Sequence, residues 1–166
     1  MNNKIFLFSD SIQSGKTSAV LGWVKNRKNV SGILTPDIDG VRMLYDVKYH
    51  TYHPFETNVN ELREVEVIGR FVFLKSAFKK AIAIFYEALR RKTEWLIIDE
   101  IGKLELADKG LEPALSLVLE NFSANSPETK IIIIVRDYLL DATIKKYGFK
   151  DAEIVNVGFF RENKYP

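Results

Sequence analysis

An eight-residue segment near the start of the sequence, DSIQSGKT at positions 10–17, constrains the fold more than any other feature. It follows an apolar run at residues 5–8 and opens a segment whose apolar residues recur at helical spacing. A strand, a tight loop ending in Gly-Lys-Thr and a helix are together typical of a phosphate-binding loop, or P-loop. The same residues taken alone also fit an ordinary strand–turn–helix connection with a surface lysine. A second element elsewhere in the chain must therefore decide between the two interpretations.

The P-loop hypothesis predicts a role for each part of this segment. The loop N–H groups and the positive N-terminal end of the helix bind phosphate. We therefore expect nucleotide contacts from Ser11, Ile12, Gln13, Ser14, Gly15, Lys16, Thr17 and Ser18. Gly15 lets the backbone approach a phosphate closely, and Lys16 is expected to reach the outer phosphates. The hydroxyl of Thr17 is expected to bind Mg²⁺.

Position 10 departs from the usual pattern, G-x-x-x-x-G-K-[ST], because Asp10 stands in place of the first glycine. Aspartate is one of the few residues that tolerate the left-handed backbone conformation, so the loop can keep its shape. A carboxylate beside a triphosphate is repulsive unless Mg²⁺, Lys16 or its own hydrogen bonds offset the charge. We therefore expect this substitution to affect affinity and turnover more than the fold.

The composition argues against several classes of function. A chain of 166 residues fits one domain, so we predict a single domain over residues 1–166. The formal net charge of +2 and the short, scattered basic clusters give no basis for nucleic-acid binding. The sequence has no cysteine, which excludes disulfides and cysteine metal sites. The first apolar run is too short for a signal peptide or a membrane span, so we expect a cytoplasmic protein without membrane contact.

Strand and helix patterns alternate along most of the chain. Strands are predicted at residues 4–8, 31–35, 95–98, 131–135 and 153–157. Helices are predicted from the P-loop to about residue 28 and over residues 75–92, 111–122 and 138–147. This alternation favours an α/β fold with a mainly parallel sheet flanked by helices. Ligands of such sheets bind at the carboxyl ends of the strands.

Residues 41–49 differ from this pattern. Apolar and polar residues alternate there at every second position, which predicts a half-exposed strand of an antiparallel ribbon inserted after the second strand. A further strand is predicted at residues 68–73, and the polar residues 55–64 are predicted to form a loop. His50 and His53 have no acidic or cysteine partner at ligand spacing, so we interpret them as surface residues.

Two adjacent carboxylates, Asp99 and Glu100, follow the apolar run at residues 95–98. An apolar strand that ends in an aspartate is the Walker B element, in which the aspartate helps to hold Mg²⁺. The adjacent glutamate can orient and deprotonate an attacking water. Arg136 follows another predicted strand, so the P-loop, both carboxylates and this arginine can converge on one crevice. Because both elements are present in a fitting order, we favour the P-loop over an ordinary turn.

The residues around these carboxylates resemble a known family. IIDEIGKLEL at positions 97–106 is similar to the D-E-I-G-K-M-E-L signature of the cancer-related nucleoside-triphosphatase family, small P-loop proteins known also from thermophiles. GILTP at positions 32–36 resembles the family's G-F-x-T-P turn, and GRF at positions 69–71 its G-R-Y. Arg42 stands where the family has an arginine in its ribbon. The resemblance implies a P-loop NTPase domain of the RecA-like ASCE class that hydrolyses nucleoside triphosphates to diphosphate and phosphate with Mg²⁺, with broad base tolerance.

By this resemblance, Lys16 and Glu100 are catalytic residues, and Thr17 and Asp99 hold the metal. Lys103 and Arg136 are candidates to face the phosphates, although a solvated or salt-bridged role fits each of them equally well.

Two alternative functions stay open. The first is a nucleotide-binding module with weak or lost hydrolysis, which Asp10 favours. The second is a phosphotransferase that acts on a small acceptor, because P-loop folds also host kinases. Glu100 beside Asp99 favours activation of water over activation of an alcohol.

Overall fold

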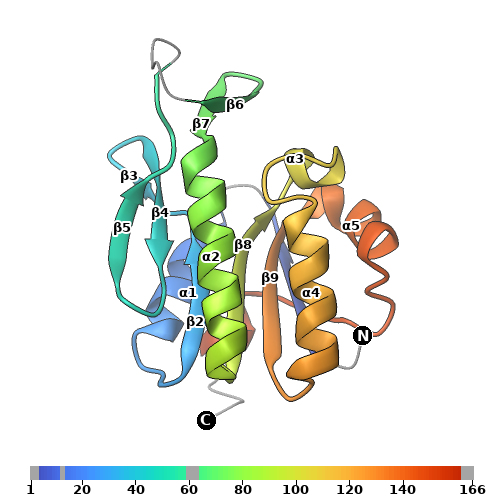
Figure 1. Cartoon of the computed structure of the whole chain (residues 1–166). Coiled ribbons are helices and arrows are strands. Elements are labelled where there is room, and N and C mark those ends of the chain that lie inside the picture. The colour runs from blue at the N-terminus through green and yellow to red at the C-terminus, as the bar shows by residue number, and fades with distance from the viewer. Residues whose placement is uncertain (1–3, 12–13, 59–63, 162–166) are drawn as a thin grey trace.

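The computed structural model describes residues 4–11, 14–58 and 64–161. Its centre is a twisted sheet with the strand order β10-β1-β9-β8-β2-β4-β3, in which β5 pairs with β4 (Figure 1). The parallel strands are β1 (Ile5–Asp10), β2 (Val30–Leu34), β8 (Trp95–Ile101), β9 (Lys130–Arg136) and β10 (Glu153–Val155). The predicted mainly parallel sheet is therefore confirmed. Because β9 lies between β1 and β8, the P-loop strand and the carboxylate strand are not neighbours.

Helices cover both faces of this sheet. Figure 1 shows α2 (Lys75–Arg91) and α4 (Ala114–Asn125) on the face toward the viewer and α1 (Lys16–Val24) behind the sheet. The short helix α6 (Val157–Arg161) packs beside α1. Two further helices, α3 (Lys103–Leu106) and α5 (Leu140–Tyr147), follow the carboxyl ends of β8 and β9, the second after a 3-10 turn at Asp137–Leu139.

The parallel strands are buried on both faces, which explains their nearly continuous apolar sequences. In β9, Ile131, Ile133 and Val135 belong to the core beneath α2 and α4, whereas Ile132 and Ile134 face the core beneath α1. Burial of each such side chain contributes roughly 1.5–3 kcal/mol. The burial of β9 on both faces therefore fixes the position of the residues at its carboxyl end.

Strand β2 approaches β8 unusually closely at Gly32. This residue pairs with Ile97 and has φ of 119°, a conformation that L side chains rarely adopt. A Cβ at this position would overlap the backbone N and O atoms of Ile97. Only glycine therefore fits here without a shift of one strand.

The antiparallel insertion after β2 is also confirmed. It consists of β3 (Asp37–Ile38), β4 (Val41–Asp46) and β5 (Thr51–Pro54), and it extends the main sheet beyond β2. A separate hairpin follows, formed by β6 (Val65–Ile68) and β7 (Phe71–Leu74). The prediction of one strand over residues 68–73 is wrong, because the chain reverses at Gly69-Arg70 and pairs Ile68 with Phe71. Gly69 adopts φ of 58°, the positive value that such a turn requires.

Other boundaries also differ from the predictions. Helix α1 ends at Val24 rather than near residue 28, and α4 begins at Ala114, directly after Pro113. The last predicted strand is too long, because β10 ends at Val155 and α6 follows. Phe159 and Phe160 of α6 pack on Phe6 and Phe8 of β1, at ring-centroid distances of 5.1 and 4.6 Å. This tertiary packing outweighs the short apolar run that suggested a longer strand.

Over the described residues, no helix combines the length and apolar character that a bilayer crossing requires.

Candidate active site

The P-loop lies between β1 and α1, as predicted. Lys16 is the first residue of α1, and Gly15 before it has φ of 78°, in the left-handed region. The ammonium of Lys16 donates hydrogen bonds to the carbonyl oxygens of Asp10 and Ser11, at 2.6 and 2.7 Å. The Lys16 side chain thus curls over the loop that precedes it. Ile12 and Gln13, which were predicted to contact nucleotide, lie outside the described residues.

Other P-loop residues are close to these groups. Ser14 donates its backbone N–H to the carbonyl of Ser11 at 3.2 Å, and its hydroxyl lies 3.4 Å from the Lys16 ammonium. Ser18 is exposed on the first turn of α1. The carboxylate of Asp10 accepts the Ser11 N–H at 2.7 Å. The acidic side chain at the unusual position therefore binds one loop amide.

Thr17 and Asp99 meet although 82 positions separate them in the sequence. The Thr17 hydroxyl donates to Oδ2 of Asp99 at 2.9 Å, and the backbone N–H of Thr35 donates to the same oxygen at 2.9 Å. Asp99 is only 2% exposed. Its burial raises the pKa to about 6, and the nearby charge of Glu100 adds to this rise. The hydrogen bonds from Thr35 and Thr17 and the charge of Arg42 act in the opposite direction.

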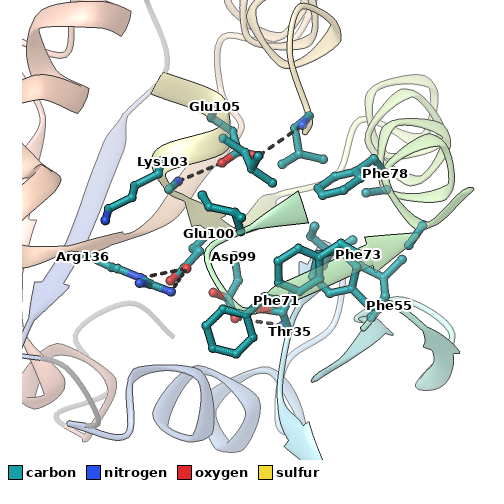
Figure 2. A pocket seen from close by; sticks show the side chains of 18 of the residues that line it. Thr35, Phe55, Phe71, Phe73, Phe78, Asp99, Glu100, Lys103, Glu105 and Arg136 are labelled. Carbon is teal, nitrogen blue, oxygen red and sulfur yellow. Dashed lines mark hydrogen bonds and ion pairs between the residues drawn. The ribbon is translucent and has the colours of Figure 1, made fainter. Parts of the chain in front are cut away.

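Glu100 faces two arginines from other strands. Arg136, at the end of β9, places Nη2 at 2.9 Å and Nε at 3.1 Å from Oε1 of Glu100 (Figure 2). Arg42 of β4 lies 3.6 Å from the same oxygen. Arg136 also pairs in register with Asp10 at the start of the P-loop. It therefore stands between the two predicted motifs, as its place at a strand end suggested.

Lys103 lies farther from the carboxylates. Its side chain is exposed, and its ammonium is 5.8 Å from the ring centre of Tyr138. The Tyr138 hydroxyl in turn accepts a hydrogen bond from Arg136 at 3.3 Å. Lys103 is thus at the rim of the site rather than in contact with Asp99 or Glu100.

Glu105 lies in the segment after the two carboxylates and binds the backbone of that segment. Its buried carboxylate accepts the backbone N–H of Gly102 at 2.9 Å and that of Leu111 at 3.2 Å. Burial raises the pKa of Glu105, while these two hydrogen bonds oppose the rise. Its backbone carbonyl accepts a hydrogen bond from Lys146 at 2.7 Å. Glu105 therefore stabilises the turn that follows β8.

Sequence reasoning missed several contributors to the site. Thr35 acts through its backbone; it belongs to the GILTP stretch that was noted for the resemblance, but nothing there indicated a contact with Asp99. Arg42 was noted for its place in the ribbon, but nothing in the sequence placed it beside Glu100. Tyr138 follows Arg136 by two residues and gave no separate signal.

The strand order, the loop before α1 and the buried aspartate bonded to the threonine of that loop together define the P-loop class of nucleotide-binding proteins. A family model described as NTPase matches residues 5–164, so the chain belongs to that family.

The chain is also similar to a solved structure, THEP1 from the hyperthermophile Aquifex aeolicus. The TM-score is 0.70 at 19% sequence identity, and the match covers 97% of this chain and 92% of THEP1. At this level of identity the likeness concerns the fold. A comparison with curated proteins gives no match.

Proposed function

We propose that this protein hydrolyses nucleoside triphosphates to diphosphate and phosphate in an Mg²⁺-dependent reaction. The observation that carries the proposal is the Thr17–Asp99 hydrogen bond of 2.9 Å, which unites the P-loop with the carboxylate strand. A glutamate directly follows this aspartate and lies beside an arginine. Membership of the NTPase family supports a nucleoside triphosphate as the substrate.

The residues present fit a magnesium ion. Mg²⁺ prefers oxygen ligands and is usually bound by one or two carboxylates together with water and substrate phosphates. Thr17 and Asp99 offer a hydroxyl and a carboxylate in direct contact. Asp99 is buried and its pKa is raised, so a nearby cation would favour its ionised form. When bound, Mg²⁺ would neutralise charge on the outer phosphates.

Lys16 and the loop amides would hold the phosphates. The Lys16 ammonium lies over the loop, within hydrogen-bond distance of two of its carbonyls. The N-terminal end of α1 adds favourable partial charge there.

Glu100 is proposed as the general base. A water oxygen attacks the terminal phosphorus, its proton passes to Glu100, and the bond to the bridging oxygen breaks. Arg136 holds Glu100 in position through contacts of 2.9 and 3.1 Å. Its guanidinium has donors enough to bind a terminal phosphate as well, which suits stabilisation of the charge that develops there.

A second candidate function is a nucleotide-binding module with weak hydrolysis. Asp10 favours it, because its carboxylate adds negative charge to the loop and takes up the Ser11 amide. Phosphate release from each of the four common nucleoside triphosphates, with Mg²⁺ and with excess chelator, distinguishes the two functions. We expect release that requires Mg²⁺. Nucleotide binding without any Mg²⁺-dependent release would instead support the binding module.

A further inference from the structure

A cavity of about 220 Å³ lies next to Glu100 on the side away from the P-loop. Its walls come from segments that are far apart in sequence: the end of β2, β4, the hairpin β6–β7, α2 and the end of β8 with α3. Figure 2 shows the carboxylates at one side of the cavity and a group of phenylalanines at the other. The cavity therefore has two chemically different walls.

The apolar wall is built mainly from aromatic rings. Phe55 stacks on Phe73 at a centroid distance of 4.5 Å and meets Phe78 edge-on at 5.3 Å. Phe71 continues the row beside Phe73 at 6.1 Å, and Leu104 lies on the side of α3. Such a wall suits a flat or branched apolar body.

The polar wall belongs to the proposed catalytic site. It contains Asp99, Glu100, Glu105, Arg136 and the end of β2 at Thr35. Two further cationic side chains, Arg70 and Lys103, also line the cavity. Among the described P-loop residues, 11 and 14–18, none lines the cavity. Over the described residues, the cavity thus meets the proposed nucleotide site at Asp99, Glu100, Arg136 and Thr35. A nucleotide whose outer phosphates are held by Lys16 would present its terminal phosphate to this opening.

The size of the cavity exceeds what hydrolysis needs. One water occupies about 30 Å³ of liquid, whereas an apolar cavity of about 150 Å³ already accepts benzene. Empty apolar space also reduces stability, because the lining side chains lose packing contacts. A cavity of this size beside the catalytic base is therefore better explained by a second ligand than by the attacking water alone.

The carboxylates on the polar wall do not call for a cationic ligand. Asp99 is bonded to Thr17 and Thr35, Glu100 is paired with Arg136, and Glu105 accepts two backbone amides. These carboxylates thus have partners within the protein and do not require a cation. The ligand group that reaches Glu100 needs to donate one hydrogen bond, as a hydroxyl does.

We propose that this cavity binds a small alcohol with an aromatic or branched apolar body, and that the protein transfers the terminal phosphoryl group to its hydroxyl. The alcohol oxygen attacks the terminal phosphorus, and its proton passes to Glu100. The bond from that phosphorus to the bridging oxygen breaks, which leaves a nucleoside diphosphate and a phosphate monoester. This proposal rests on the proposed nucleotide site, and it makes water a competing acceptor.

The test uses benzyl alcohol as the probe and toluene as the analogue without a hydroxyl. Binding to the full chain is measured by saturation-transfer NMR, and products formed with Mg²⁺ and nucleoside triphosphate are measured by ³¹P NMR. Ala81→Leu places a larger side chain in the cavity, which Ala81 of α2 lines. Ala83→Leu is the matched control, because Ala83 is exposed on the same helix. Phe71→Ser, on the half-buried hairpin, tests the aromatic wall if Ala81→Leu does not fold.

We expect both probes to bind the wild type and Ala83→Leu, with at least tenfold weaker binding to Ala81→Leu or Phe71→Ser. Only benzyl alcohol should yield a phosphate ester, and ester formation should fall with binding while phosphate release to water continues.

Three outcomes would count against the proposals. If all variants bind the two probes equally, or if the wild type binds neither probe, the cavity is not a second ligand site. Binding with phosphate release but no benzyl phosphate overturns the acceptor role. Benzyl phosphate without release to water instead overturns the proposed hydrolysis and leaves the acceptor site standing.

Discussion

The two halves of the candidate site are built in different ways. The P-loop half is local in sequence: residues 10–18 supply its groups, and its lysine contacts carbonyls only five and six positions away. The carboxylate half is assembled from β2, β4, β8 and β9, and its aspartate is almost fully buried. The comparison indicates that the proposed phosphate binding depends on a short motif, whereas the proposed chemistry depends on the packing of the whole sheet. Substitutions in the two halves should therefore have different signatures.

Glu100→Gln should give the largest effect on turnover. The amide keeps the shape of the side chain but cannot accept the proton from water, and a general base contributes roughly 10²–10⁴-fold. Steady-state phosphate release should fall by about that factor, while equilibrium binding of Mg²⁺–nucleotide is kept or slightly tightened. Glu120→Gln on the exposed face of α4 is the control. Unchanged turnover in Glu100→Gln would show that Glu100 is not the base.

Asp99→Asn should have opposite effects on the stability of the folded chain and on Mg²⁺–nucleotide binding. The carboxyl of Asp99 binds its proton more tightly in the folded chain, because burial raises its pKa from 3.8 to about 6. Its contribution to stability is therefore present at pH below 3.8 and is lost as the pH rises through about 6. The shift corresponds to about 3 kcal/mol.

Thermal or denaturant unfolding should then find Asp99→Asn more stable than the wild type at pH 8 but not at pH 3.5, with Mg²⁺–nucleotide binding impaired. Wild-type hydrolysis should also decline in acid as Asp99 takes up a proton. A bound cation favours the ionised form, so this decline should lie at a pH lower than 6. The opposite result would contradict this account: the stability of Asp99→Asn, relative to that of the wild type, would then be lower at pH 8 than at pH 3.5.

Lys16→Ala should weaken nucleotide binding and leave the fold intact. Hydrogen bonds to charged groups contribute about 1.5–3 kcal/mol, so we expect a loss of about 10–100-fold in affinity by calorimetry. Lys25→Ala, just beyond α1, removes a similar exposed charge outside the loop and serves as the control. If Lys16→Ala and the wild type bound nucleotide with equal affinity, the proposed role of the P-loop in phosphate binding would be wrong.

Asp10 should give the smallest effect. If its charge repels the phosphates, Asp10→Gly and Asp10→Asn should both tighten binding by a few-fold. If its hydrogen bond to the Ser11 amide shapes the loop instead, Asp10→Gly should weaken both affinity and turnover, whereas Asp10→Asn can retain the bond. We expect both variants to bind nucleotide more tightly, and parallel nucleotide titrations of the two variants distinguish the two outcomes.

The sequence predicted the local half well and the assembled half in part. The motif at residues 10–17 placed Thr17 in the loop after one strand, and the apolar run before Asp99 placed that residue at the end of another. Arg136 could be placed at the same edge for the same reason. The sequence predicted one continuous strand through Gly69 instead of a hairpin turn, because the residues next to the turn on both sides are apolar.

The rest depended on contacts that no local pattern encodes. The position of Arg42 beside Glu100 follows from how β4 pairs with β2, and the aromatic wall joins Phe55, Phe73 and Phe78 from three elements. Helix α6 forms because two phenylalanines find partners on β1, which a single sequence does not reveal.

The close approach at Gly32 has a consequence for mutational surveys. Gly32 is not one of the proposed site residues, yet it faces the backbone of Ile97, two residues before Asp99. Any side chain there has to displace the strand that carries both carboxylates. A screen that selects only for lost activity would therefore recover Gly32 alongside Glu100, and only a measurement of nucleotide affinity and protein yield would tell the displaced scaffold from the missing base.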